Sequence, residues 1–167
     1  MVEKLFWLLP AASLLALGFA WYFFRVMMKE SEGTERMQEI ASHVREGAMA
    51  YISRQYSVVL KVFMVLFVFL LILAYFKIQS PFVPVAFLTG GFFSGLCGYL
   101  GMRTATFASG RTANGCRTSL NQGLKIAFRS GAVMGLVVVG FGLLNIALWF
   151  FVLDKVVYTA AHMQQGV

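Results

Sequence analysis

The stretch SGAVMGLVVVGFGLLNIALWFFVL, residues 130–153, runs for 24 residues without a charged side chain. At 1.5 Å per residue, a helix of this length is about 36 Å long, whereas the hydrocarbon core of a bilayer is about 30 Å thick. The stretch therefore predicts a helix that spans a membrane.

Three further apolar stretches have the same character, namely residues 5–24, 57–76 and 82–102. Lys61 lies inside the second of these, where a lysine near a helix end can extend its amine to the headgroups. A secretory signal is the alternative for residues 5–24, but the apolar core of such a signal is usually 7–15 residues long. This run is longer and ends in aromatic residues that suit a membrane interface. The fold expected for residues 1–167 is an all-α, polytopic membrane segment with four transmembrane helices.

The composition agrees with this class. Hydrophobic residues make up 59% of the 167 residues, charged residues make up 13%, and the mean hydropathy is +0.76. Soluble domains carry about 25% charged residues. The two cysteines, Cys97 and Cys116, are too few for a disulfide framework and are interpreted as small apolar residues that fill space or as free thiols.

The net charge of +7 comes from basic residues that lie between the spans. Eleven of the 14 belong to the two long connections, if Lys61 at the start of span two is counted with the first: Arg25, Lys29, Arg36, Arg45, Arg54, Lys61, Arg103, Arg111, Arg117, Lys125 and Arg129. Only Lys4, Lys77 and Lys155 lie on the other side. The positive-inside rule then places both long connections in the cytoplasm and both chain ends outside. This distribution explains the charge without a nucleic-acid partner.

The first long connection has a helical pattern. Thr34 can cap a helix whose first turn holds Glu35, and apolar residues then recur at three- and four-residue steps as far as Ile52. An amphipathic cytoplasmic helix is expected over residues 34–56, continuing into the second span as one long helix. A helix lying flat on the bilayer is the alternative. The short turn near residues 77–84 predicts antiparallel second and third spans.

Small residues mark the third and fourth spans. Gly91 and Gly95, like Gly131 and Gly135, have the spacing that lets helices approach closely in lipid. Residues 104–119 are interpreted as a second cytoplasmic helix, although Gly110 and Gly115 disfavour a regular one. In the fourth span, Asn145 is expected to form an interhelical hydrogen bond.

Residues suited to catalysis are scarce. None of the seven acidic residues lies inside a predicted span; they are Glu3, Glu30, Glu32, Glu35, Glu39, Glu46 and Asp154. A small transporter is disfavoured, because ion paths in membranes usually need an ionisable group at depth. His43 and His162 have no metal-ligand neighbours, and no phosphate-binding loop occurs. No catalytic, cofactor-binding or metal-binding residue is therefore predicted in this chain.

Three blocks of the sequence resemble the membrane-bound, ion-translocating pyrophosphatases. GTERMQEIA (33–41) and REGAMAYISRQY (45–56) resemble that family's first cytoplasmic connection. GMRTAT (101–106) with RTA (111–113) resembles its second, and AFRSGAVMG (127–135) is similar to the start of its fourth helix. Asn114–Cys116 departs from the acidic, alanine-rich run typical there.

The resemblance implies the N-terminal portion of a larger pump in a bacterial or archaeal cytoplasmic membrane. Such pumps have about sixteen helices per subunit, work as homodimers, and couple pyrophosphate hydrolysis to outward transport of H⁺ or Na⁺. It also implies a Mg²⁺ cofactor, with K⁺ in some members. The family's Asp-x-x-x-Asp-x-x-x-Lys substrate motifs are absent from these residues.

Two hypotheses follow. The chain is a scaffold portion of a pyrophosphate-energised pump, as a truncated product or an incomplete sequence, and is inactive alone. Alternatively, it is a stand-alone four-helix membrane protein with a structural or assembly role.

Overall fold

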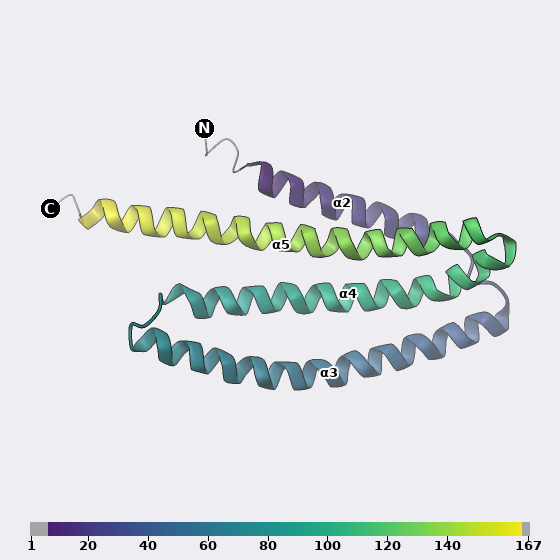
Figure 1. The fold of residues 1–167 in the computed structure, drawn as a ribbon, viewed down its shortest axis with the longest axis horizontal. Coiled ribbons are helices and arrows are strands. Elements are labelled where there is room, and N and C mark those ends of the chain that lie inside the picture. The colour runs from purple at the N-terminus through teal and green to yellow at the C-terminus, as the bar shows by residue number, and fades with distance from the viewer. Residues whose placement is uncertain (1–6, 165–167) are drawn as a thin grey trace.

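The chain folds into four helices, with no strand among residues 7–164, the part that the computed structural model describes (side chains for 7–155). The helices are α2 (Leu8–Met28), α3 (Glu35–Tyr75), α4 (Phe82–Thr118) and α5 (Leu120–Gln164) (Figure 1). All four are long and apolar enough to cross a membrane. The predicted all-α class with four membrane helices is confirmed; residues 5 and 6 of the first predicted span lie outside the described part.

The amphipathic segment and the second span form one continuous helix, α3, as the sequence predicts. This helix runs for 41 residues, or about 60 Å, and begins where Thr34 accepts a hydrogen bond from the backbone N–H of Met37 at 3.4 Å. The basic amphipathic part and the apolar part thus form one rod that runs alongside α4 (Figure 1).

The helices form an antiparallel series in which α2 packs on α5, α5 on α4, and α4 on α3 (Figure 1). Between α2 and α5, the buried Ser13 donates its hydroxyl to the carbonyl of Gly140 at 2.6 Å. A Cβ at Gly140 would lie 2.8 Å from the side chain of Leu17, so this glycine permits the close contact.

The predicted second cytoplasmic helix is present, and Gly110 and Gly115 do not make it irregular. Helix α4 continues through both residues to Thr118, and the single residue Ser119 joins it to α5. A Cβ at Gly115 would lie 3.2 Å from the backbone nitrogen of Gly123, so the glycine lets α5 fold back closely on α4. Tertiary packing outweighs the low helix propensity of glycine at this position.

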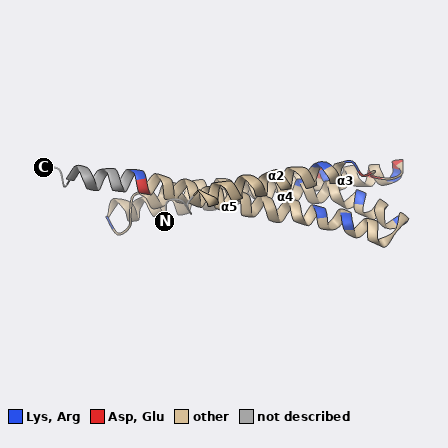
Figure 2. Ribbon diagram, turned by 90° about the horizontal axis from the view of Figure 1, so that it is seen from above, with Lys and Arg blue, Asp and Glu red and all other residues tan. Residues whose placement is uncertain are grey.

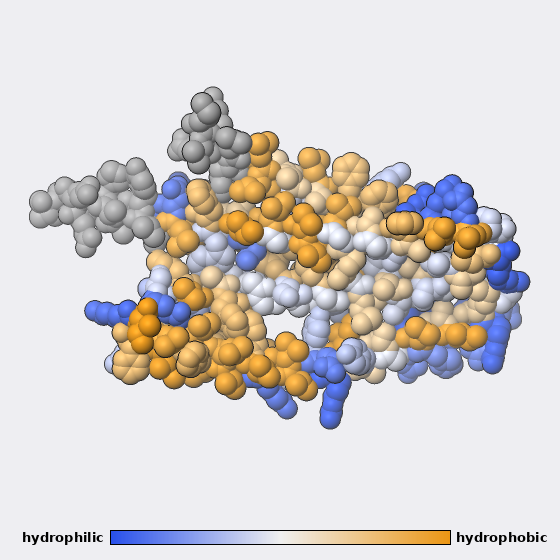
Figure 3. Space-filling view, viewed as in Figure 1, coloured by the Kyte–Doolittle hydropathy of each residue, from blue (hydrophilic) through white to orange (hydrophobic). Residues whose placement is uncertain are grey.

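The buried core is small and lies between α2, α4 and α5. One cluster consists of Ala20, Cys97, Val133 and Val137. A second consists of Met27, Ala108 and Ile126. Large apolar side chains cover the outer surface instead (Figure 3), and the most apolar window of α3 has no buried residue. Such a surface suits lipid or further helices better than water.

Basic residues are distributed unevenly along the bundle. Lys and Arg gather at the end that carries residues 29–34 and Ser119 (Figure 2), here called the basic end. Lys77, Asp154 and Lys155 lie toward the opposite end.

Candidate functional site

The connection between α2 and α3, residues 29–34, is held at the basic end by side chains from the other helices. Gly33 has a φ of 93°, a conformation that favours glycine, and a Cβ there would lie 2.8 Å from Oδ1 of Asn114. Asn114 donates its amide to the carbonyl of Ser31 at 3.2 Å. The connection is therefore fitted against α4.

Arg111 on α4 forms the centre of this contact. Its Nε donates to the carbonyl of Glu30 at 3.0 Å, and its Nη1 donates to Glu32 Oε1 at 2.6 Å and to the carbonyl of Phe107 at 2.7 Å. Only 8% of the residue is exposed. A guanidinium can satisfy backbone and carboxylate acceptors together because its donors are arranged as a planar fork.

Two further arginines complete the arrangement. Arg45 on α3 lies 2.7 Å from the same oxygen of Glu32, and Arg129 on α5 lies 3.4 Å from Glu30 Oε1. We call Glu30, Glu32, Arg45, Arg111 and Arg129 the ion-pair cluster. It joins the α2–α3 connection to three helices and has a net charge of +1.

An aromatic ring lies beside the cluster. The guanidinium carbon of Arg45 lies 5.1 Å from the ring centre of Phe107, and those of Arg103 and Arg111 lie 5.9 Å from it. Because the face of an aromatic ring attracts cations, Phe107 offsets part of the repulsion between these arginines.

This arrangement suits holding the helices together and does not suit binding Mg²⁺. Both carboxylates of the cluster are paired with arginine, and the described part holds no group of three or more His, Cys, Asp or Glu that could ligate a metal. Mg²⁺ requires free oxygen ligands. The residues present do not fit the metal that the resemblance implies.

The other sequence candidates lie apart from the cluster. His43 Nδ1 lies 4.0 Å from Glu46 Oε2 on the exposed face of α3. Cys97 is buried and Cys116 is exposed, both as free thiols. The side chain of His162 lies outside the described residues.

Asn145 does not behave as expected. Its Oδ1 is buried, and no partner for this oxygen is found within residues 7–155. The amide faces Gly90, where a Cβ would lie 3.9 Å from its nitrogen. One turn away on α5, Trp149 does form the interhelical bond, donating to Thr89 Oγ1 at 2.7 Å.

The two glycine pairs differ in use. A Cβ at Gly91 would overlap the ring of Phe63, so a side chain of α3 fills that space, and Tyr56 donates its hydroxyl to the carbonyl of Gly95 at 2.6 Å. A Cβ at Gly131 or Gly135 would meet nothing within 4 Å. The predicted close packing is thus present at Gly91 on α4, whereas a Cβ at Gly95, as at Gly131 and Gly135 on α5, would meet no described atom within 4 Å.

The sequence did not predict the contacts among Glu30, Glu32 and Arg111. Glu32 and Arg111 are 79 positions apart, and no local spacing connects them. The available signal was the placement of two carboxylates in a six-residue connection surrounded by basic segments.

Comparison with known proteins agrees with the resemblance found in the sequence. The sequence profile of the family described as inorganic H⁺ pyrophosphatase matches residues 14–166. A protein of Bacteroides thetaiotaomicron named "Putative K(+)-stimulated pyrophosphate-energized sodium pump" is 62% identical over 154 residues, which cover 92% of this chain and 21% of that protein.

Two other relatives are more distant. A K⁺-insensitive pyrophosphate-energized proton pump of Moorella thermoacetica is 42% identical, over 89% of this chain and 21% of its own length. A K⁺-stimulated pyrophosphate-energized sodium pump of Thermotoga maritima is 39% identical, over 92% of this chain and 20% of its own length. The chain thus spans about a fifth of the length of these relatives. Since the family match extends over residues 14–166 of 167, this chain is an integral membrane protein that belongs to the inorganic H⁺ pyrophosphatase family.

Proposed function

We propose that this chain is the N-terminal scaffold portion of a pyrophosphate-energised pump for H⁺ or Na⁺. The supporting observation is a match that covers 92% of this chain but 21% of the relative, in a chain whose described residues offer no metal-ligating cluster. The residues that bind pyrophosphate, Mg²⁺ and, where required, K⁺ would then belong to the remaining helices of the same pump. Residues 1–167 alone would be inactive.

The outer faces of the bundle that the described residues leave uncovered favour the proposal that further helices of the pump pack against it. Gly131 and Gly135 leave open space on α5, and small residues at such spacing allow close helix packing in lipid. The most apolar window of α3 is likewise uncovered within the described part. The complete pump is proposed to be a homodimer that buries some of these faces.

The charge distribution supports an orientation. Most Lys and Arg residues gather toward the basic end, whereas Lys77 lies in the turn between α3 and α4 at the other, and by the positive-inside rule this distribution supports a cytoplasmic basic end. Both chain ends are then outside a bacterial or archaeal cytoplasmic membrane. In this orientation the ion-pair cluster lies on the cytoplasmic side, where it would fix the helices that surround the catalytic ones.

A chimera tests the proposal directly. Residues 1–167 replace the region that they match in the Bacteroides relative, and membrane vesicles are assayed for Mg²⁺-dependent phosphate release from pyrophosphate. Uptake of H⁺ or Na⁺ is measured in parallel, with and without K⁺. The controls are the relative without that region and residues 1–167 alone.

The chimera is expected to restore hydrolysis and ion uptake, and both controls are expected to lack them. Pyrophosphate hydrolysis by residues 1–167 alone would overturn the assignment of catalysis to the remaining helices. A chimera that inserts stably yet is as inactive as the truncated relative would favour the stand-alone structural protein.

A further inference from the structure

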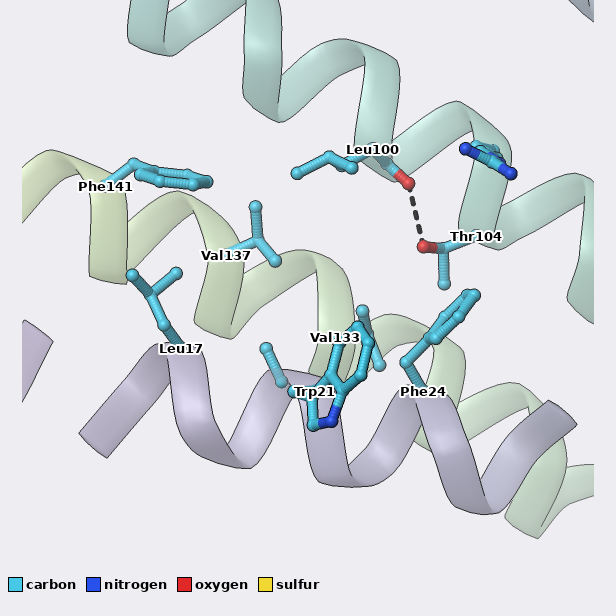
Figure 4. A pocket seen from close by; sticks show the side chains of 10 residues that line it. Leu17, Trp21, Phe24, Leu100, Thr104, Val133, Val137 and Phe141 are labelled. Carbon is cyan, nitrogen blue, oxygen red and sulfur yellow. Dashed lines mark hydrogen bonds between the residues drawn. The ribbon is translucent and has the colours of Figure 1, made fainter. Parts of the chain in front are cut away.

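An apolar groove with a volume of about 410 Å³ lies between α2, α4 and α5. Figure 4 shows Leu17 and Phe141 at one end and Phe24 and Thr104 at the other, with Val137 between them. The lining residues extend over 17–24 on α2 and 133–141 on α5, which corresponds to about 10–12 Å along each helix. This length is most of one bilayer leaflet, about 15 Å of hydrocarbon.

One end of the groove is cationic. Arg103 is the only charged residue among those that line it, and it is exposed. Trp21 lines the same groove, and the guanidinium of Arg25 lies 4.5 Å from the centre of its ring. Both arginines lie on the side of the groove that faces the basic end, Arg25 in the last turn of α2 and Arg103 just after the third predicted span on α4.

These two arginines lack the acidic partners that the ion-pair cluster has. Among the ion pairs of residues 7–155, none involves Arg25 or Arg103, whose recorded contacts are with the rings of Trp21 and Phe107. The hydroxyl of Thr104 is already used, donating to the carbonyl of Leu100 at 2.7 Å. The polar groups that remain available to a ligand at this end of the groove are therefore the guanidiniums of Arg25 and Arg103.

We propose that this groove binds one acyl chain of an anionic phospholipid, whose phosphate contacts Arg103 and Arg25. An apolar groove that starts at a pair of uncompensated guanidiniums matches the shape and charge of such a lipid. Basic pockets between membrane helices are known to hold anionic headgroups, and arginine binds phosphate through its fork of donors. Trp21 has the amphipathic ring that suits the interface between headgroup and hydrocarbon.

The test uses phosphatidylglycerol and phosphatidylcholine that carry the same photoactivatable acyl chain. Each is mixed at low mole fraction into phosphatidylcholine vesicles containing the full chain, and attachment sites are mapped by mass spectrometry of proteolytic fragments. The same measurement on the chimera presents the groove whether or not the pump is active, so a failed pump and a failed lipid site are distinguishable. Circular dichroism verifies the helices.

The anionic lipid is expected to label residues 17–24 and 133–141 in higher yield than the neutral lipid. Arg103→Gln should reduce that preference about fivefold, because a basic residue near an anionic surface contributes about 1 kcal/mol. Arg103→Lys should retain most of the preference, because it retains the charge. Val137→Trp should lower the yield of both lipids, because it fills the groove without changing its charge.

Arg54→Gln is the matched control, since Arg54 is an exposed arginine on α3, near the start of the predicted second span and outside the groove. It should leave the preference unchanged. The proposal is wrong if the two lipids label the groove equally, or if Arg54→Gln acts as strongly as Arg103→Gln. The proposal is also wrong if neither lipid labels the groove residues in the chimera, because protein would then cover the groove.

Discussion

Nη1 of Arg111 lies 2.6 Å from Oε1 of Glu32, across 79 residues of sequence. The contact joins the C-terminal part of α4 to the connection that leaves α2, and Arg45 shares the same oxygen from α3. One carboxylate thus positions three helices at the basic end. Since the side chain of Glu32 is only 15% exposed, water screens these pairs less than it would at an open surface.

Glu32→Gln should loosen the connection. The change removes the negative charge that two guanidiniums share, and hydrogen bonds to charged groups contribute about 1.5–3 kcal/mol. Trypsin cleavage after the exposed Lys29, measured in detergent, should become about 10- to 100-fold faster if it follows local opening. Glu46→Gln is the control because its side chain is 84% exposed. Equal cleavage rates for the two variants would contradict the role assigned to Glu32.

Two glycine substitutions should have opposite results. Gly91→Ala would force the ring of Phe63 to move and should lower the stability of the chain by about 1–3 kcal/mol. Gly131→Ala meets open space and should be neutral or stabilising by up to about 1 kcal/mol. Thermal unfolding followed by circular dichroism in detergent measures both.

Gly131→Ala also tests whether another helix of the pump packs against α5. In the chimera, Gly131→Ala should reduce pump activity if another helix packs against that face. If the chimera tolerates Gly131→Ala with full activity, the proposal that helices cover this part of α5 loses its support.

The membrane helices could be predicted from sequence because each depends on a local property. Runs without charge define the spans. Thr34 caps the start of α3 by accepting a hydrogen bond from the backbone N–H of Met37, three positions along the chain. The ion-pair cluster could not be predicted in this way. Its formation requires Glu32 to meet Arg111 across two helices, and only the packed arrangement determines that meeting.

The other differences between the sequence predictions and the structure depend on which way each helix face points. The spacing of Gly91 and Gly95 matches that of Gly131 and Gly135, but only the packing geometry determines that Gly91 faces Phe63 while the other three face open space. Likewise, the apolar context predicted a hydrogen bond for Asn145, whereas Trp149, one turn further along, is the residue that faces Thr89.

Asn145→Leu should stabilise the isolated chain. A buried oxygen without a partner costs about 1–3 kcal/mol, and leucine has a similar shape without that cost. Trp149→Phe is the matched comparison on the same helix and should destabilise by about 0.5–1.5 kcal/mol, because it removes a satisfied bond. The unfolding temperatures of the two variants should therefore move in opposite directions. A loss of stability in Asn145→Leu would show that the amide has a partner.

Cysteine labelling tests the orientation, using thiols that the chain already has. Cys116 is exposed at the basic end, whereas Cys97 is buried between helices and serves as an internal control. In right-side-out vesicles, a membrane-impermeant maleimide should leave Cys116 unlabelled until the membrane is opened with detergent. Gln79→Cys, in the turn between α3 and α4, should react at once. The reverse pattern would place the basic end outside, against the excess of arginine and lysine there, and would remove the ion-pair cluster from the cytoplasmic side on which its proposed role depends.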